Sequence, residues 1–176
     1  MKSYKKGIQS KEEIIERSRE LFNEFGIHLT LASLAEKMET TLGRITHYFQ
    51  NKDLLFLAIA GEYERKLLEL RMNRPAGPVT MDMFVKGVSQ VMDLQYSYRC
   101  SQRYVIASIQ KPREIKSHIQ QTYLNNKTVI RITVSGYVTS GSLKPEVLNG
   151  DTYEGFFFQL SNLLTNWGIN LELYDS

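Results

Sequence analysis

Apolar and polar residues alternate at helical spacing along most of this chain. Between residues 11 and 25, side chains suited to a buried face recur three and four positions apart. These positions are Ile14, Ile15, Ser18, Leu21, Phe22 and Phe25. Ser10 followed by Glu13 has the pattern of a capping box, and Gly26 supplies a left-handed stop. We therefore predict a first helix over residues 11–25.

Three more helices are expected before residue 73. Thr30 is suited to cap a second helix with the sequence LASLAEKM, and Thr41 is suited to cap a third that ends near His47. Asn51 is suited to cap a long fourth helix, over about residues 52–72. The third helix is the unusual one, because it is only about two turns long and carries very few apolar anchors.

The second half of the chain also has helical patterning. Residues 73–79, NRPAGPV, hold two prolines and a glycine, which predict a linker. Helices are expected over about residues 81–96, 103–110, 112–138 and 151–171, with SGSLKPEVLNG as a loop or a short turn. The segment TVIRITVSGYVT is rich in β-branched residues and could form a strand. We predict a helix there, because the preceding IKSHIQQTYLNNK is helical and no partner strand is apparent. The fold class is therefore expected to be all-α.

Two helices joined by a tight turn, the second short and polar, are typical of a helix-turn-helix. The second helix of this motif enters a DNA major groove about 12 Å wide, so its exposed side must be small or hydrogen-bonding. Ile45 and Phe49 are expected to anchor it, and Gly43 removes a side chain where the backbone would approach DNA.

The remaining residues of this segment divide into two groups by position. Base-facing positions at the start of the helix are occupied by Thr41, Leu42 and Arg44. Phosphate-facing positions are expected to be Thr46, His47, Tyr48 and Lys52, the last at a helix N-terminus that favours an anion. Each residue taken alone has an ordinary alternative. His47 and Arg44 could be plain surface residues, and Tyr48 could be part of the core.

Residues 10–60 resemble the DNA-binding domain of TetR-family transcriptional repressors. The resemblance rests on a helix that ends in LFNEFG, then TLASLAEKM, then a short helix with a glycine followed by HYF, then NKDLL. It implies an N-terminal three-helix helix-turn-helix domain (residues 1–52), a connecting helix (53–72) and a C-terminal helical effector-binding and dimerisation domain (73–176). It also implies a cytoplasmic homodimer that binds double-stranded DNA at a palindromic operator. A small-molecule effector would release such a repressor from its DNA.

The chain departs from the family pattern in several places. The family usually has a glycine where Glu39 stands, so either a non-glycine residue adopts the turn or the turn differs. Thr40 replaces an apolar residue, and Thr46 replaces a common tyrosine. Family members usually end with two long interface helices, whereas one clear candidate, 151–171, is present here. Either the interface is built differently or the second helix is missing from this chain.

The C-terminal domain holds two further groups of candidates. Effector-binding residues are expected among Met92, Tyr96, Tyr104, Tyr123 and Trp167, although each could instead belong to the core or an interface. The aromatic stripe of the last helix suits a dimer interface formed by Phe156, Phe157, Leu160 and Leu164. Two copies of a short recognition helix on a two-fold axis would contact a palindrome.

Charge and composition narrow the class of protein. The net charge is +3, but residues 83–144 carry a balance of +7 and residues 145–176 a balance of −5. The basic stretch would suit an anionic ligand or simply a solvated face. Four lysines precede the first acid, Glu12, and could form a phosphate-neutralising arm or a frayed terminus. A single cysteine, Cys100, fits a reducing cytoplasm.

Other functions find little support in the sequence. No apolar run is long enough for a membrane span. The three histidines lack metal-ligand spacing, and there is no phosphate loop or nucleophile motif, so no metal, no cofactor and no enzymatic activity are expected. The alternative function that stays open is a helical ligand-binding or interaction protein without specific DNA binding.

Overall fold

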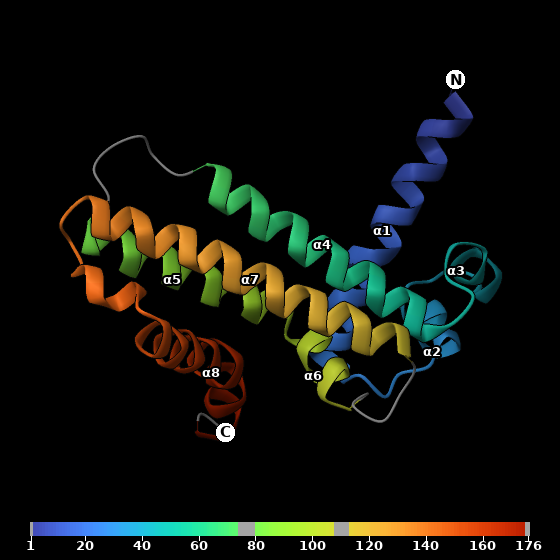
Figure 1. The fold of residues 1–176 in the computed structure, drawn as a ribbon. Helices are drawn as coiled ribbons and strands as arrows, with labels where there is room; N and C mark the ends of the chain where they lie inside the picture. Colours follow the sequence, from blue (N-terminus) through green and yellow to red (C-terminus); the bar gives the residue numbers. More distant parts are fainter. Residues whose placement is uncertain (1, 74–79, 108–112, 175–176) are drawn as a thin grey trace. The chain divides into compact units, whose positions relative to one another are not determined.

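The computed structural model describes residues 2–73, 80–107 and 113–174, and these residues form helices and no strand. The N-terminal elements are α1 (Lys2–Phe25), α2 (Leu31–Lys37), α3 (Leu42–Tyr48) and α4 (Lys52–Met72) (Figure 1). They are followed by α5 (Met81–Ser97), α6 (Arg99–Ala107), α7 (Arg113–Thr139), the 3₁₀ helix η1 (Pro145–Leu148) and α8 (Gly150–Tyr174). The predicted all-α fold class is confirmed. The expected linker prolines and Pro112 lie outside the described residues.

The first helix is longer than predicted, because α1 begins at Lys2 rather than at residue 11. Ser10 therefore lies inside the helix, and the predicted capping box is wrong. Residues 2–9 contain no proline, so nothing in the sequence prevents the helix from extending toward the N-terminus. Ser10 and Glu13 lie one helical turn apart on α1, and both contact Arg44 instead.

The chain divides into two compact units, and α6 belongs to the first of them. Unit 1 comprises residues 1–68 and 97–109, and unit 2 comprises residues 69–96 and 110–176. The predicted domain boundary at residue 73 assigned α6 to the C-terminal domain, so the structure differs here. α6 belongs to unit 1 because it makes polar contacts with α1, between residues more than seventy positions apart in the sequence.

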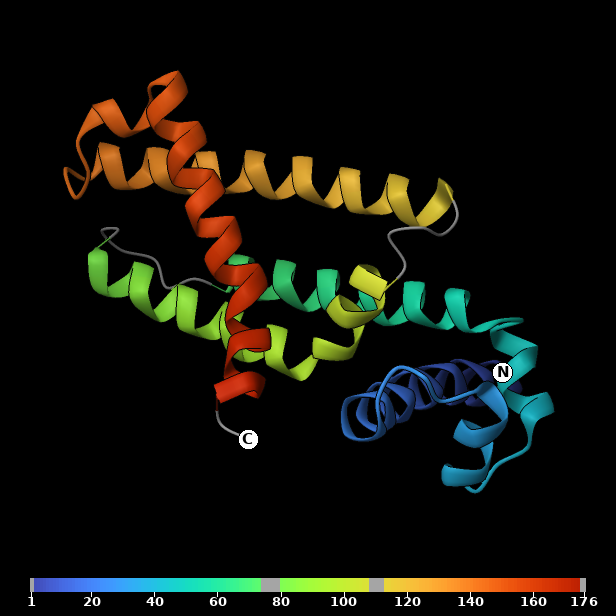
Figure 2. The ribbon, with the colours of Figure 1, turned by 90° about the horizontal axis from the view of Figure 1, so that it is seen from below.

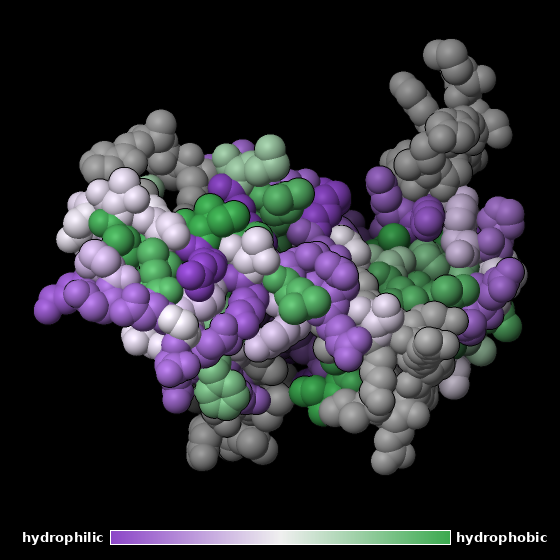
Figure 3. All heavy atoms as spheres, in the orientation of Figure 1, coloured by the Kyte–Doolittle hydropathy of each residue, from purple (hydrophilic) through white to green (hydrophobic). Residues whose placement is uncertain are grey.

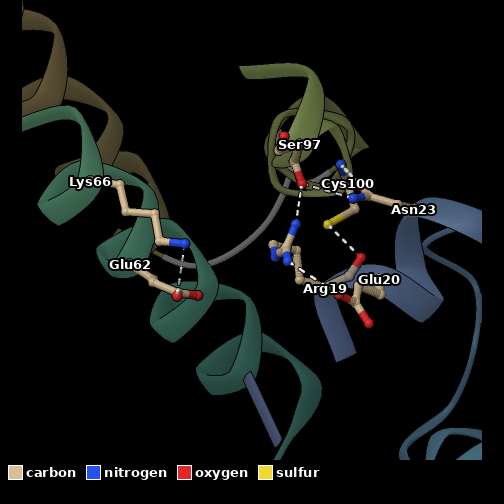
Figure 4. Close-up of polar contacts among 7 residues, drawn as sticks. All are labelled: Arg19, Glu20, Asn23, Glu62, Lys66, Ser97 and Cys100. Carbon is tan, nitrogen blue, oxygen red and sulfur yellow. Dashed lines mark hydrogen bonds and ion pairs between the residues drawn. The ribbon is translucent and has the colours of Figure 1, made fainter. Parts of the chain in front are cut away.

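Asn23 and Arg19 of α1 hold the start of α6. The Asn23 side chain donates to the Ser97 carbonyl at 2.8 Å and accepts from the Cys100 N–H at 3.0 Å (Figure 4). Arg19 donates to the same Ser97 carbonyl at 2.9 Å. One side chain thus satisfies a free N–H at the start of α6, which explains why this helix begins four residues before the predicted start.

A stack of three aromatic rings forms the centre of unit 1. The ring centroids of Phe22 and Phe56 are 4.4 Å apart, and those of Phe56 and Tyr104 are 3.7 Å apart. The stack joins α1, α4 and α6. Unit 1 also contains fully buried aliphatic side chains, namely Ile14, Leu34, Ile45, Leu55 and Ile59. The helix-turn-helix and α6 therefore belong to one compact unit.

Unit 2 joins α5, α7 and α8 through aromatic and polar contacts. Phe84 packs edge-on against Tyr137, with ring centroids 5.7 Å apart, which connects α5 with α7. The Tyr153 hydroxyl of α8 donates to the Lys127 carbonyl of α7 at 2.6 Å. Figure 2 shows α8 crossing α5, where the Trp167 indole N–H donates to the Gln95 side chain at 2.9 Å.

The β-branched segment of α7 is helical, as predicted. The hydroxyls of Thr128, Thr133 and Thr139 each donate to the carbonyl four residues earlier, at 3.0 to 3.1 Å. The helix thus satisfies the polar groups of these residues, although β-branched residues favour strands when a partner strand is present. Among the described residues, no helix is both long and apolar enough to cross a membrane.

Candidate nucleic-acid interface

Side-chain caps define the start of each helix in the helix-turn-helix. The Thr30 hydroxyl accepts from the Ser33 N–H at 3.0 Å at the start of α2. The Thr41 hydroxyl accepts from the Arg44 N–H at 3.2 Å at the start of α3. Asn51 accepts from the Leu54 N–H at 2.9 Å at the start of α4. The three predicted caps are confirmed, so the limits of α3 are encoded locally.

The turn between α2 and α3 contains a residue in the left-handed region. Glu39 has φ 53°, the one non-glycine residue with positive φ in the described part of the chain. Its N–H still donates to the Glu36 carbonyl at 3.0 Å, and the Thr40 N–H donates to the Ala35 carbonyl at 2.9 Å. A non-glycine residue therefore adopts the turn that the family usually makes with glycine. This conformation costs an L-residue roughly 1–2 kcal/mol.

The short helix α3 is anchored on one side and open on the other. Ile45 is fully buried and Phe49 is 3% exposed, whereas Leu42 is 45% exposed. The other exposed positions of the segment are Thr41, Gly43, Arg44 and His47. The predicted anchors are confirmed, and the exposed side carries the residues expected to face DNA bases.

Gly43 has no packing reason to be glycine. A Cβ atom built on Gly43 would meet nothing within 4 Å, and its φ is not in the left-handed region. Glycine near the start of a helix nevertheless lowers helix stability relative to alanine. The empty space next to Gly43 is therefore on the outer side of α3, where a binding partner could approach the backbone.

Arg44 is exposed but already has partners within the protein. Its Nη2 lies 3.2 Å from a Glu13 carboxylate oxygen and 3.3 Å from the Ser10 hydroxyl. The Arg44 and Glu13 side chains are 45% and 50% exposed, so the ion pair lies at the surface. Glu13 was predicted to belong to a capping box, which the longer α1 makes unnecessary, and it contacts Arg44 instead.

The expected phosphate-facing residues occupy different environments. The Thr46 hydroxyl donates back to the Leu42 carbonyl at 3.1 Å, within its own helix. His47 is exposed, and its ring meets the half-buried Tyr48 edge-on, with centroids 4.8 Å apart. His47 and Tyr48 thus lie together at the end of α3, whereas the Thr46 hydroxyl is directed along the helix.

Lys52 lies at the start of α4, as predicted, and has acceptors within the protein. Its ammonium group donates to the Ile27 carbonyl at 2.9 Å and to the Leu29 carbonyl at 3.3 Å. These carbonyls belong to the segment between α1 and α2, which the lysine ties to the start of α4. The ammonium group is thus partly buried and engaged within the protein, whereas an open position was expected for a phosphate contact. The sequence could not indicate this, because a carbonyl acceptor is present at every residue.

Of the five predicted effector-binding residues, two are brought together. Tyr96 and Trp167 lie with ring centroids 6.3 Å apart, and Met92 precedes Tyr96 by one turn of α5. Tyr104 belongs to the core of unit 1, where it is 5% exposed and its hydroxyl donates to Asp53. It therefore belongs to unit 1, whereas the other four candidates belong to unit 2. Tyr123 packs instead on Phe157, with centroids 5.2 Å apart.

The predicted interface stripe of α8 is partly internal. Phe157 is 1% exposed and packs on Tyr153 and Tyr123 within unit 2, so it is a core residue rather than an open interface residue. Phe156, Leu160 and Leu164 are half-buried. Among the α8 side chains that the structure describes, the exposed large apolar ones are Phe158 and Leu163, at 61% and 54%. Phe157 therefore belongs to the core of unit 2, and an interface formed by Phe156, Leu160 and Leu164 stays a prediction.

No group of histidine, cysteine, aspartate and glutamate side chains in the described residues is arranged to hold a metal ion. Cys100 is fully buried, and burial raises the pKa of its thiol to about 11. The thiol is therefore protonated at neutral pH and is not an activated nucleophile.

The fold and the capped, open-faced α3 define an all-α helix-turn-helix protein. Residues 14–59 match the family model described as bacterial regulatory proteins, tetR family. No curated protein matches the chain. The match covers α2, α3 and parts of α1 and α4, which are the elements of the helix-turn-helix domain.

Two solved structures resemble the chain over nearly its whole length. A TetR-family transcriptional regulator from Marinobacter aquaeolei VT8 is 20% identical, with a TM-score of 0.82. The match covers 93% of this chain and 80% of that one. A proposed fatty acid metabolism regulator from Clostridium perfringens is 14% identical, with a TM-score of 0.63, over 93% of this chain and 87% of that one. At these identities the likeness concerns the fold.

Proposed function

We propose that this protein is a homodimeric transcriptional repressor that binds a palindromic operator and is released from it by a small-molecule effector. The TetR-family domain at residues 14–59 supports binding to double-stranded DNA. The similar fold from Marinobacter aquaeolei belongs to a transcriptional regulator, which supports the same role for the whole chain. The protein acts by binding, and catalysis has no part in the proposal.

The observation that carries the proposal is the construction of α3. A helix of seven residues has one fully buried side chain, Ile45, and leaves Leu42, Gly43, Arg44 and His47 exposed. So short a helix is marginal by itself, and it is stabilised here by packing and by its Thr41 cap. The exposed side offers an arginine for guanine and an apolar side chain for a thymine methyl group.

The proposed contacts have different parts in DNA binding. Thr41, Leu42 and Arg44 would face base edges, and Thr46, His47 and Tyr48 would lie along the phosphates. Lys52 enters the proposal as a positioning residue, because its ammonium group joins the segment before α2 to the start of α4. It would orient α3 without itself contacting a phosphate.

Unit 2 would supply dimerisation and effector binding. Phe158 and Leu163 are exposed on α8, and Ile132 is exposed on α7 at 67%. Over α7, Figure 3 shows apolar patches separated by hydrophilic groups. Apolar side chains of this kind suit the core of an interface between two copies. The pair of Tyr96 and Trp167, together with Met92, is the candidate effector region.

Selection of duplexes from a random library by the purified protein tests the proposal. The expected result is an enriched palindrome that is bound by two protein chains, with an affinity that falls steeply as salt concentration rises. A scrambled duplex of the same composition is the control. Equal binding of the selected and scrambled duplexes would favour the alternative, a helical ligand-binding or interaction protein without specific DNA binding.

A further inference from the structure

The contacts of Arg44 with α1 have a consequence for DNA binding. Nη2 of a guanidinium carries two hydrogens, and Arg44 Nη2 has two acceptors, the Glu13 carboxylate at 3.2 Å and the Ser10 hydroxyl at 3.3 Å. Both acceptors come from α1, one helical turn apart. They thus engage the nitrogen of the guanidinium that is most needed for base recognition.

A guanidinium has two edges that present a pair of parallel donors. One edge combines Nη2 with Nη1, and the other combines Nη2 with Nε, so both include Nη2. A bidentate contact with the O6 and N7 atoms of guanine requires one of these edges. While Glu13 and Ser10 occupy both Nη2 hydrogens, Arg44 has no complete edge to offer.

We propose that Glu13, assisted by Ser10, is a competitor for the base-contacting arginine and so sets the DNA affinity of this protein. The inference rests on the proposed function. Arg44 must exchange the Glu13 carboxylate for guanine when the protein binds its operator. The cost of that exchange is subtracted from the free energy of binding. Because the ion pair is half-exposed, this cost is small enough for DNA to overcome.

The surroundings of the pair support an exchange rather than a permanent structural contact. A shallow hollow between α1 and the α2–α3 turn is lined by Glu13, Arg17 and Arg44, among others. The exposed Arg44 side chain can therefore leave Glu13 without disturbing the buried anchor Ile45. Arg17 lines the same hollow, so a second basic side chain is present beside the pair.

The test compares Glu13→Gln with Glu12→Gln. Glu12 is an exposed acid on the same helix, so its substitution removes the same charge. The probe is a duplex selected by the wild-type protein from a random library. Exposed ion pairs are worth up to about fivefold in an equilibrium constant. Glu13→Gln should therefore bind the probe up to about fivefold more tightly than Glu12→Gln does.

The same two substitutions in an Arg44→Ala background separate competition from general repulsion of phosphates. The advantage of Glu13→Gln over Glu12→Gln should disappear there, because no arginine remains to be released. An advantage that persists in the Arg44→Ala background would overturn the proposal. So would weaker binding by Glu13→Gln in the wild-type background, since Glu13 would then be a support that orients Arg44 toward DNA.

A measurement without DNA distinguishes failure of this inference from failure of the proposed function. The unfolding equilibrium of wild type, Glu13→Gln, Arg44→Ala and the double variant should show a coupling of up to about fivefold. Coupling in the unfolding equilibrium without a selectable duplex would refute DNA binding and, with it, the competitor role. A selected duplex with no such coupling would refute the ion pair while leaving DNA binding intact.

Discussion

Replacement of Gly43 by alanine should make the protein more stable and a weaker DNA binder. Alanine is favoured over glycine within a helix by about 0.5–1 kcal/mol. The added Cβ meets nothing within 4 Å in the free protein, so no clash offsets this gain. For a chain of this length the melting temperature should rise by a few degrees at most.

The DNA complex should respond in the opposite direction. If the backbone at Gly43 approaches DNA closely, the methyl group enters a filled contact, and overpacking of this kind costs about 1–3 kcal/mol. The operator affinity should therefore fall between about fivefold and 150-fold. Fluorescence anisotropy with a labelled duplex measures the affinity, and urea unfolding measures the stability.

Gly61 provides the matched control. It lies in the middle of α4, and a Cβ added there also meets nothing within 4 Å. Gly61→Ala should stabilise the protein by a similar amount and leave DNA affinity unchanged. If Gly43→Ala binds operator DNA as tightly as Gly61→Ala does, the outer side of α3 is not the surface that approaches DNA.

Three further substitutions test particular contacts. Glu39→Gly should raise the free energy of unfolding by about 0.5–1 kcal/mol in urea titrations, because glycine adopts φ 53° without strain. The control Glu36→Gly, inside α2, should lower the free energy of unfolding by about 1 kcal/mol. A loss of stability in both variants would contradict the strained turn. Lys52→Met should lower the free energy of unfolding by about 1.5–3 kcal/mol, because it removes a charged donor from two carbonyls. Lys86→Met, at an exposed lysine, is the control. An unchanged melting temperature combined with weaker DNA binding would indicate that Lys52 contacts a phosphate. Burial raises the pKa of the Cys100 thiol in the folded state to about 11. As the pH rises above the ordinary pKa of a cysteine, the unfolded chain therefore loses this proton first. The free energy of unfolding should then fall by up to about 1.4 kcal/mol per pH unit. Cys100→Ala should lack this part of the slope between pH 9 and 11, and identical slopes would show that the thiol is not buried.

Local signals in the sequence were sufficient for much of the DNA-binding domain. Thr30, Thr41 and Asn51 each cap the predicted helix, because a cap depends on a hydroxyl or amide and a backbone N–H within three residues. The periodicity of apolar residues likewise identified Ile45 and Phe49 as anchors. The sequence left open whether Glu39 adopts the left-handed turn or the turn differs, and the structure places Glu39 at φ 53°.

Contacts between distant segments could not be predicted in the same way. Asn23 binds both Ser97 and Cys100, and nothing in the local sequence of α6 indicates this partner. Lys52 and Arg44 are residues of the types that commonly contact DNA, yet both bind partners within the protein. A charged side chain indicates that a partner is needed but does not identify it, and the fold alone decides whether an internal acceptor is within reach.

The response of Arg44→Ala on two duplexes tests the central claim most directly. Equilibrium binding would be measured on the duplex selected by the wild-type protein and on its scrambled counterpart, at the same salt concentration. If α3 contacts bases through Arg44, affinity for the selected duplex should fall by about 1–3 kcal/mol while the scrambled duplex is bound almost as before. Equal losses on the two duplexes would contradict the claim and would make Arg44 a contact to the phosphate backbone.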